Sequence, residues 1–421
     1  MDKFVIEKSG PLCGRVQVSG AKNSCLALMA ASLLTEEPVE LENSPDLVDV
    51  RTMSQVLGYL GVETQRVGRS LLRIDSAGAE GFKAPYELVS RMRASYYVLG
   101  PLTARRGRAE VSLPGGCAIG QRPIDLHLKG LALLGAEITT TGGYVTVRAR
   151  KLRGCQVDLE GRFGTSVGAT ANVMMAATLA SGTTVIVNAA HEPEIADLAE
   201  MLSAMGARIE GAGKSRLVIE GVPALKGVRH TVIPDRIEAG TFAVAAALTG
   251  GEVVIAECRP DHLEAVCGLL EMVGVKVEKG ERTLLVGRES ELSSFEVATR
   301  PYPGFPTDMQ AQFCALATQA RGTSVIEENI FENRAMHVPE LARFGADIRS
   351  EGRRIIVRGP SRLSSAPVMA SDLRASAALV LAALVAEGQS EIHRIYHLDR
   401  GYENLEVKLA RLGARILRVS N

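Results

Sequence analysis

The chain has 421 residues, and its 48 lysines and arginines are balanced by 48 aspartates and glutamates. An apolar content of 46% with 23% charged residues is typical of a globular protein and excludes wholesale disorder. A neutral chain with 8 tyrosines, 9 phenylalanines and no tryptophan lacks both the basic field and the stacking surfaces that nucleic-acid binding uses, so we expect no nucleic-acid partner.

The length predicts two or three domains. The N-terminus has no basic-then-apolar signal, and the longest apolar run, residues 375–386, is about a dozen residues, too short to span a bilayer. The cysteines are dispersed without CxxC pairs, which favours a reducing compartment over a disulfide framework or a zinc site. We therefore expect a cytoplasmic protein with no membrane insertion.

A short pattern recurs along the whole chain: an apolar helix end, a glycine, a small apolar residue and an alternating strand. Its glycines stand about 70 residues apart, at positions 61, 135, 206, 274, 345 and 413. Glycine suits this place because the residue after a helix commonly adopts the left-handed conformation. The pattern predicts six repeats, each with two helices and about four strands.

Ala-rich stretches interleave with these glycines, and they are apolar on nearly every side. The clearest are residues 166–187, 238–255, 308–326 and 372–392. Helices of this kind are typically buried, and six of them do not fit one core, so we expect two lobes of three repeats. The predicted lobes are residues 22–232, and residues 1–21 together with 233–421, with the active site in the cleft between them.

The expected buried helices begin with polar or charged residues. These starts are, in chain order, Lys22 and Asn23, Arg93 to Ser95, Ser166 to Gly168, Asp308 to Gln310, and Asp372 to Arg374. Helix N-termini attract anions, so converging starts with added cations would suit a small polyanionic substrate. The alternative is that the acids and serines are plain N-caps and the cations are solvated.

Cys117 stands in a glycine-rich stretch, residues 113–126, that also contains Arg122. A cysteine on an accessible loop beside a cation has a lowered pKa and can act as an acid or nucleophile. Most cysteines are instead small buried hydrophobes, which is our interpretation of those at positions 25, 258, 267 and 314.

Asp308 follows a proline-rich turn at a helix start, where a carboxylate would stay ionised and could serve as a base. Arg334 and Arg400 lie in loops and could bind phosphate or carboxylate oxygens. His393 and His397 are four residues apart in a stretch that is typical of a strand, where both would not face one ion. We expect no metal site.

Taken in chain order, several motifs resemble those of the enolpyruvyl transferases, in particular the branch that acts on UDP-N-acetylglucosamine. They are residues 19–23 (SGAKN), 92–95 (MRAS), 114–120 (PGGCAIG), 122–126 (RPIDL), 166–170 (SVGAT), 306–308 (PTD), 332–334 (ENR), 372–374 (DLR) and 399–403 (DRGYE). The resemblance spans the whole chain. It implies a two-lobed inside-out α/β barrel with three repeats in each lobe.

The resemblance also implies an activity that needs no cofactor: transfer of the enolpyruvyl group of phosphoenolpyruvate to the 3′-hydroxyl of UDP-N-acetylglucosamine, the first committed step of peptidoglycan synthesis. The implied catalytic residues are Cys117, Asp308, Lys22 and Arg400, with Cys117 also forming a covalent phospholactoyl adduct and reacting with fosfomycin. The implied phosphoenolpyruvate ligands are Lys22, Arg93, Arg122, Arg334, Arg374 and Arg400. The implied UDP-sugar ligands are Asn23, Arg93, Arg122, Pro123, Ile124, Asp125, Leu126, Ser166, Val167, Gly168, Asp308 and Ile330.

One stretch departs from the family pattern. Before Ser166 the chain reads GRFGT, residues 161–165, and no basic residue there matches the family clearly, although Arg162 could fill the role on a shifted loop. Two other functions are considered. The sister transferase that acts on shikimate 3-phosphate shares the fold but is disfavoured by the Cys117 loop and by residues 122–126, and a non-catalytic UDP-sugar sensor is disfavoured by the complete set of chemical residues.

Overall fold

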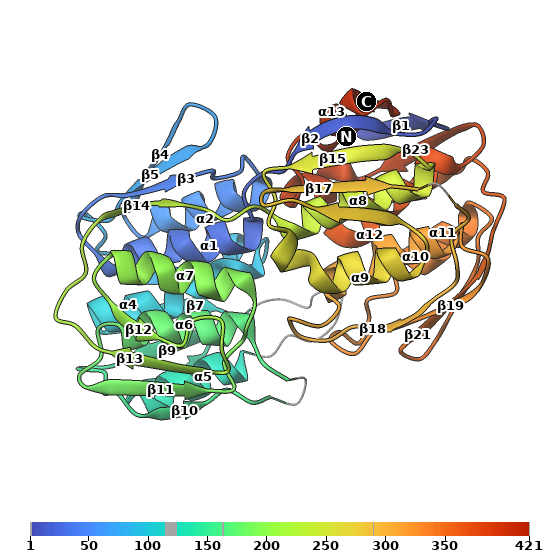
Figure 1. Ribbon diagram of the computed structural model, residues 1–421. Helices are drawn as coiled ribbons and strands as arrows, with labels where there is room; N and C mark the ends of the chain where they lie inside the picture. The colour runs from blue at the N-terminus through green and yellow to red at the C-terminus, as the bar shows by residue number, and fades with distance from the viewer. Residues whose placement is uncertain (1, 114–123, 162–163, 289, 421) are drawn as a thin grey trace. The chain divides into compact units, whose positions relative to one another are not determined.

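The computed structural model describes residues 2–113, 124–161, 164–288 and 290–420. These residues form two compact units, which are drawn in Figure 1. Unit 1 contains residues 2–19 and 234–420, and unit 2 contains residues 20–113 and 124–233. The chain therefore passes into unit 2 after Ser19 and returns to unit 1 at Pro234.

Unit 2 contains nine helical segments in its described residues. They are α1 (Lys22–Ala31), η1 (Ser32–Leu34), α2 (Val48–Tyr59), α3 (Tyr86–Val89), η2 (Arg93–Val98), α4 (Leu99–Arg106), α5 (Asp125–Leu133), α6 (Val167–Ala177) and α7 (Pro193–Ala204), where η marks a 3₁₀ helix. Its strands are β3 (Val39–Glu42), β4 (Glu63–Val67), β5 (Leu71–Asp75), β6 (Lys83–Ala84), β7 (Arg108–Ser112), β8 (Glu137–Thr141), β9 (Tyr144–Arg148), β10 (Gln156–Asp158), β11 (Thr183–Val187), β12 (Arg208–Glu210), β13 (Arg216–Glu220) and β14 (Val228–Thr231).

Unit 1 has the same kind of composition. Its helices are α8 (Arg236–Thr249), η3 (Pro260–Leu263), α9 (Glu264–Met272), η4 (Thr307–Met309), α10 (Gln310–Ala317), α11 (His337–Arg343), α12 (Leu373–Val385), η5 (Ile395–Arg400) and α13 (Leu405–Arg411). Its strands are β1 (Lys3–Glu7), β2 (Cys13–Gln17), β15 (Glu252–Ala256), β16 (Lys276–Lys279), β17 (Thr283–Gly287), β18 (Glu296–Ala298), β19 (Gly322–Glu327), β20 (Asp347–Glu351), β21 (Arg354–Gly359), β22 (Pro367–Met369), β23 (Gln389–His393) and β24 (Arg415–Val419).

The predicted repeats are confirmed by the sheets. The described residues form six four-stranded sheets, ordered β14-β3-β5-β4, β6-β7-β9-β8 and β10-β11-β13-β12 in unit 2, and β2-β15-β17-β16, β18-β19-β21-β20 and β22-β23-β1-β24 in unit 1. In each of them the first two strands are parallel and the other neighbours are antiparallel. Six copies of one topology follow from six copies of one sequence pattern.

Strands remote in sequence complete three of these sheets. In unit 1, β1 lies between β23 and β24, and β2 pairs in parallel with β15. In unit 2, β14 pairs in parallel with β3. The N-terminal strands thus belong to unit 1, although the polypeptide that follows them builds unit 2.

The glycines that define the repeat have the predicted conformation. At positions 61, 135, 206, 274, 345 and 413 their φ angles lie between +88° and +105°. Each follows the end of a helix and turns the chain into the next strand, a backbone conformation that a side chain would strain. The repeat can therefore be seen in the sequence because one backbone geometry recurs.

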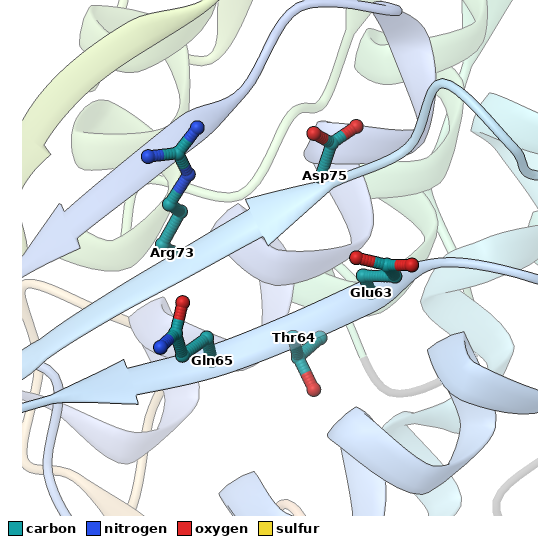
Figure 2. A pocket seen from close by; sticks show the side chains of 5 residues that line it. All are labelled: Glu63, Thr64, Gln65, Arg73 and Asp75. Atoms are coloured by element: carbon teal, nitrogen blue, oxygen red, sulfur yellow. The ribbon is translucent and has the colours of Figure 1, made fainter.

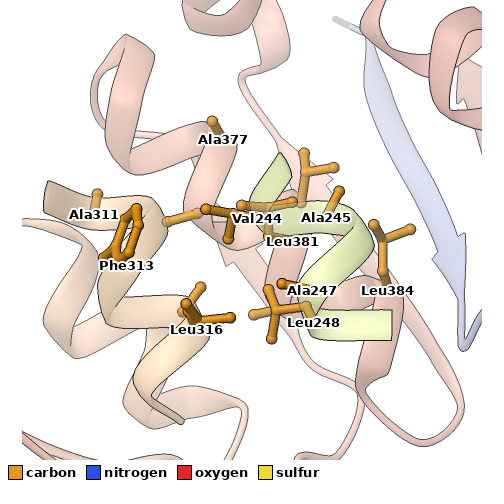
Figure 3. Close-up of a cluster of buried hydrophobic side chains, with 14 of the residues drawn as sticks. Val244, Ala245, Ala247, Leu248, Ala311, Phe313, Leu316, Ala377, Leu381 and Leu384 are labelled. Carbon is orange, nitrogen blue, oxygen red and sulfur yellow. The ribbon is translucent and has the colours of Figure 1, made fainter. Parts of the chain in front are cut away.

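The Ala-rich helices are buried on all sides, as predicted. In unit 1, α8, α10 and α12 pack together, and Figure 3 shows Val244, Phe313 and Leu381 among the buried side chains that these helices contribute to the core. These three side chains are at most 1% exposed. Small alanines let these helices approach closely, and the Ala-rich helices of each unit lie inside it.

Two local predictions were wrong. Residues 93–98, expected as the start of a regular helix, form the 3₁₀ segment η2 before α4 begins. His397, expected in a strand with His393, lies in the 3₁₀ segment η5, because Arg394 adopts a φ of +59° and ends β23.

Candidate functional site

Three of the predicted charged residues form an ion cluster in unit 1. Arg334 Nη2 lies 2.7 Å from Asp308 Oδ1, and Arg374 Nε lies 3.2 Å from Asp308 Oδ2. Asp308 comes from η4, just before α10, while Arg374 is the second residue of α12. The ends of two buried helices thus bring together residues that are 66 positions apart.

Burial makes this ion cluster (Asp308, Arg334 and Arg374) costly to disrupt. The side chains of Arg334 and Arg374 are 7% and 3% exposed, and a buried guanidinium is tolerated only when it is paired. The two cations offset the negative charge of Asp308. Each guanidinium has five N–H donors, and the Asp308 carboxylate cannot accept hydrogen bonds from all of them. Donors therefore remain with which the ion cluster could bind an anionic ligand.

Tyr402 supports Arg374 from the other side. The Arg374 guanidinium lies over the Tyr402 ring at 5.2 Å, and the Tyr402 hydroxyl is 2.9 Å from Thr241 Oγ1. Burial acts to lower the pKa of Arg374, but Tyr402 and Asp308 outweigh it and the pKa is raised. Arg374 therefore remains a cation. Arg400, the last residue of η5, precedes Gly401, whose backbone packs against Leu373 at the start of α12.

Glu328 holds the loop that carries Ile330 and the turn before Asp308. Its Oε1 accepts hydrogen bonds from the backbone N–H groups of Ile330 and Phe331 at 2.8 and 3.0 Å. Its Oε2 accepts one from Thr307 Oγ1 at 2.8 Å, and Thr307 Oγ1 in turn accepts one from Arg334 Nη1 at 2.7 Å. This buried carboxylate connects Asp308's turn to the Arg334 side chain.

In unit 2, the start of α1 carries Lys22 and Asn23. Lys22 Nζ lies 3.3 Å from Asp49 Oδ2, and both side chains are largely buried. The next residue, Ser24, donates a hydrogen bond to Asp197, which also accepts one from His230 Nε2 at 2.7 Å. Polar contacts to α2 and α7 therefore fix the first turn of α1.

Five of the predicted UDP-sugar residues of unit 2 lie at the starts of α5 and α6. Asp125 and Leu126 open α5, Val167 and Gly168 open α6, and Ser166 caps α6 by accepting a hydrogen bond from Ala169 N at 3.3 Å. Arg93 opens η2, which contacts α6.

Asn172 joins these segments in what we call the amide cluster (Asn172, His127, Tyr96 and Gly100). Its Nδ2 lies 3.0 Å from the Tyr96 carbonyl and 2.9 Å from His127 Nδ1, and its Oδ1 accepts from Gly100 N at 2.7 Å. The Asn172 side chain thus connects η2, α4 and α5 to α6.

Several predicted residues lie outside the described part of the chain: Cys117, Arg122 and Pro123, as well as Arg162. The cysteines predicted to be buried are buried, at positions 25, 258, 267 and 314. Burial raises the pKa of the Cys25, Cys258 and Cys267 thiols to about 11, so they are poor nucleophiles near neutral pH. Among residues 2–113, 124–161, 164–288 and 290–420, no group of three or more His, Cys, Asp and Glu side chains could hold a metal ion.

A surface hollow on the β4–β5 hairpin contains none of the predicted site residues. Figure 2 shows the residues that line it, which are Glu63, Thr64, Gln65, Arg73 and Asp75. The charged and polar side chains that line this hollow are exposed or half-buried, as on ordinary solvated surface. The convergent buried polar groups of a binding site are found instead at the helix starts.

Among the residues of these arrangements that the sequence analysis did not identify are Asp49, His127, Asn172, Asp197 and Glu328. Asn172 did leave a signal, because a polar side chain within an otherwise apolar buried helix must have a hydrogen-bond partner. The others are ordinary polar residues whose partners are distant along the chain, and no local pattern marks them.

Comparison with known proteins agrees with the fold and with the resemblance. Residues 6–409 match the family model described as EPSP synthase (3-phosphoshikimate 1-carboxyvinyltransferase). The chain therefore belongs to this family of enolpyruvyl transferases. The crystal structure of the enolpyruvyl transferase NikO from Streptomyces tendae superposes with a TM-score of 0.90 at 28% identity, covering 100% of this chain and 99% of that one. EPSP synthase from Acinetobacter baumannii superposes at 0.74 with 21% identity over 100% of both chains, which shows the shared fold.

Within the family, two relatives that are more than half identical to this chain carry the same name. It is 56% identical over 422 residues to the UDP-N-acetylglucosamine 1-carboxyvinyltransferase of Koribacter versatilis, covering 100% of this chain and 97% of that protein. It is 54% identical over 425 residues to the one of Acidobacterium capsulatum, with the same coverage. Among the described residues, no helix has the length and apolar character needed to cross a membrane.

Proposed function

We propose that this protein transfers the enolpyruvyl group of phosphoenolpyruvate to the 3′-hydroxyl of UDP-N-acetylglucosamine and releases phosphate. The observation that carries the proposal is identity of 54–56% over the whole chain to relatives named for that transfer. The ion cluster supports it, because a carboxylate next to buried guanidiniums suits a reaction between anionic substrates. The proposal places this activity in the cytoplasm, in peptidoglycan synthesis.

The first chemical step is addition. Asp308 takes the proton of the 3′-hydroxyl as that oxygen bonds to C2 of phosphoenolpyruvate. Cys117 donates a proton to C3, which becomes a methyl group as the electron pair of the double bond forms the new C–H bond. Arg334 and Arg374 hold the carboxylate of phosphoenolpyruvate while positive character develops at C2.

The second step is elimination. The Cys117 thiolate left by the addition takes a proton from the methyl group, the C2–C3 double bond forms again, and the C2–O bond to phosphate breaks with its electron pair on the phosphate. Lys22, Arg122 and Arg400 stabilise the departing phosphate, and Arg93 supports them. The chemistry needs neither a metal nor a cofactor, because proton transfers and charge stabilisation supply all of its steps.

The remaining residues of the proposal bind the nucleotide sugar. They are Asn23, Arg93, Arg122, Pro123, Ile124, Asp125, Leu126, Ser166, Val167, Gly168, Asp308 and Ile330. Cys117 is also the residue that would form a phospholactoyl adduct and be alkylated by fosfomycin, and Cys117→Asp would keep a proton donor while abolishing the alkylation.

The test is phosphate release from phosphoenolpyruvate with purified protein, measured with and without UDP-N-acetylglucosamine. We expect release only with the sugar nucleotide, and a drop of about a hundredfold to ten-thousandfold in kcat for Asp308→Asn, which removes the base. The matched control is Asp347→Asn, an exposed carboxylate on β20 that pairs with Arg358 at 3.9 Å, and its rate should equal that of the wild type.

Each result has a clear meaning once circular dichroism shows that both variants are folded. Full activity of Asp308→Asn would refute the role of Asp308 as the base. Release that requires shikimate 3-phosphate instead of the sugar nucleotide would identify the sister activity for which the family model is described. Binding of UDP-N-acetylglucosamine without any phosphate release would support a sensor.

A further inference from the structure

His127 is held in a defined orientation within unit 2. Its Nδ1 lies 2.9 Å from Asn172 Nδ2, and its ring meets the edge of the Tyr96 ring with centroids 6.4 Å apart. The side chain is 9% exposed. Within the part of the chain that the structure describes, the other ring nitrogen, Nε2, has no hydrogen-bond partner.

The partners of Asn172 determine which ring nitrogen of His127 carries the proton. The Gly100 N–H can only donate, so the atom that faces it must be the amide oxygen of Asn172. The Tyr96 carbonyl can only accept, so the Asn172 NH₂ group faces it and, at the same time, His127 Nδ1. Nδ1 is therefore an acceptor, and in a neutral imidazole the proton must be on Nε2.

Burial keeps this imidazole neutral. Desolvation, assisted by the positive charge of Arg93, lowers the pKa of His127 to about 3. The ring is consequently an uncharged donor with a fixed N–H direction under all ordinary assay conditions.

The Nε2–H group lies against the first turn of α6. A Cβ atom placed on Gly168 would be 2.9 Å from both Nε2 and Cε1 of His127, so only glycine leaves room for the ring here. Helix α6 has 11 residues, and its N-terminal end carries partial positive charge and backbone N–H donors. An unpaired donor on a largely buried side chain at such a helix end suits an anionic oxygen.

We propose that His127 Nε2–H donates a hydrogen bond to an oxygen of the diphosphate of the nucleotide sugar at the start of α6, and that Asn172 positions His127 for it. This inference rests on the proposed function for the identity of the ligand. Asn172 is a positioning residue, because it acts through the ring and through the segments it joins. The role also explains why residue 168 is a glycine.

Direct binding tests the donor without requiring turnover. Titration calorimetry with UDP and with UDP-N-acetylglucosamine compares the wild type, His127→Phe, which keeps a ring but has no donor, and His127→Gln, whose amide can reach the place of Nε2. We expect Kd to rise about tenfold or more for both ligands in the phenylalanine variant and to recover partly in the glutamine variant. His393→Phe, on β23 of unit 1, is the control and should bind as the wild type does.

An affinity within about twofold of the wild type in folded His127→Phe would overturn the proposal, since loss of a hydrogen bond to a charged group costs more than that. Equal weakening in the phenylalanine and glutamine variants would also overturn it, because the effect would then follow ring packing and not the donor. Absence of phosphate release by the wild type would refute the proposed function alone, as both ligands would still report on His127.

A second measurement uses the wild-type protein and does not depend on any variant folding. Nitrogen-15 spectra of the imidazole at neutral pH should show the tautomer protonated at Nε2, and that signal should shift when UDP is added. Asn172→Asp faces Nδ1 with an acceptor and should move a proton to that nitrogen. A wild-type ring protonated at Nδ1, or an Nε2 signal that UDP leaves unchanged, would contradict the inference.

Discussion

One cluster of polar residues in each unit shows how differently buried helices can be joined. In unit 1 the ion cluster joins Asp308, Arg334 and Arg374, and full charges meet within 3.2 Å. In unit 2 the amide cluster joins Asn172, His127, Tyr96 and Gly100 through uncharged groups. The ion cluster of unit 1 thus joins ionised groups, whereas the amide cluster of unit 2 is a neutral, oriented network.

The ion cluster and the amide cluster illustrate two ways in which a protein can bind anions. Charges bind strongly and can take part in proton transfer, but burying them is costly unless each is paired. Neutral donors bind less strongly, and their direction is set by the network around them. Only the ion cluster contains a group able to accept a proton in the reaction we propose, while the amide cluster is suited to holding a ligand.

The largest expected effect is in acid and involves one histidine near each cluster. Burial lowers the pKa of His127 to about 3, and it lowers that of His337, in α11, to about 4 against an opposing effect of Asp372. The unfolded chain binds these protons near pH 6.5, so the free energy of unfolding should fall as the pH falls below 6.5. Urea unfolding at pH 6.5 and 4.5 should differ by about 1.4 kcal/mol per pH unit for each histidine.

Variants distinguish the two contributions. His127→Phe should lose its share of the acid effect over the window from pH 6.5 to about 3, and His337→Phe its share from pH 6.5 to about 4. His393→Phe, a partly exposed histidine, should keep the wild-type slope. A slope unchanged in His127→Phe would mean that the amide cluster does not hold a neutral ring, and the contrast between the clusters would fail.

A smaller effect is expected from neutralising the carboxylate that supports the ion cluster. Glu328→Gln puts an NH₂ group where an oxygen now accepts hydrogen bonds, and we expect it to lower the free energy of unfolding by about 2 kcal/mol. The control is Glu327→Gln, which changes the neighbouring, partly exposed carboxylate. It should lower the free energy of unfolding by under about 0.5 kcal/mol.

Denaturant unfolding at pH 7.5 measures both glutamate variants. Equal stability of the two would show that Glu328 contributes no more than a surface charge, and the ion cluster would then not depend on this buried acid. Phosphate release by Glu328→Gln should also fall, because Thr307, which accepts a hydrogen bond from Arg334, loses the carboxylate to which it donates.

The smallest effect is expected at a surface ion pair away from both clusters. Arg208 and Glu220 lie 2.7 Å apart on β12 and β13, with both side chains more than half exposed. Arg208→Ala should change the free energy of unfolding by under about 0.5 kcal/mol, since solvent screens such pairs. A loss similar to that of Glu328→Gln in the same urea experiment would show that burial is not what distinguishes the clusters.

Much of the fold could be predicted because it repeats. Six glycines with positive φ, six alternating strand patterns and a set of Ala-rich stretches are local features, and the structure confirms them as six sheets around buried helices. The errors were local too. Residues 93–98 and 395–400 form 3₁₀ segments, whose short hydrogen-bonded turns leave little periodicity in the sequence.

The site was predictable only in part. Asp308, Arg334 and Arg374 were identified as candidates, but the sequence did not indicate that one carboxylate binds both guanidiniums. Asn172 could have been suspected from its apolar surroundings. Its partner His127 could not, because the two residues are 45 positions apart and meet only when α5 packs on α6.

The sequence by itself determined the repeat, the buried character of the helices and the family, because these depend on residue type and spacing along the chain. Tertiary structure alone decided which polar groups meet: Lys22 with Asp49, Glu328 with Thr307, and His127 with Asn172. Hydrogen bonds and ion pairs act over about 3 Å, so they depend on the packing of helices in space. That packing gives His127 one tautomer and gives Asp308 its two arginines.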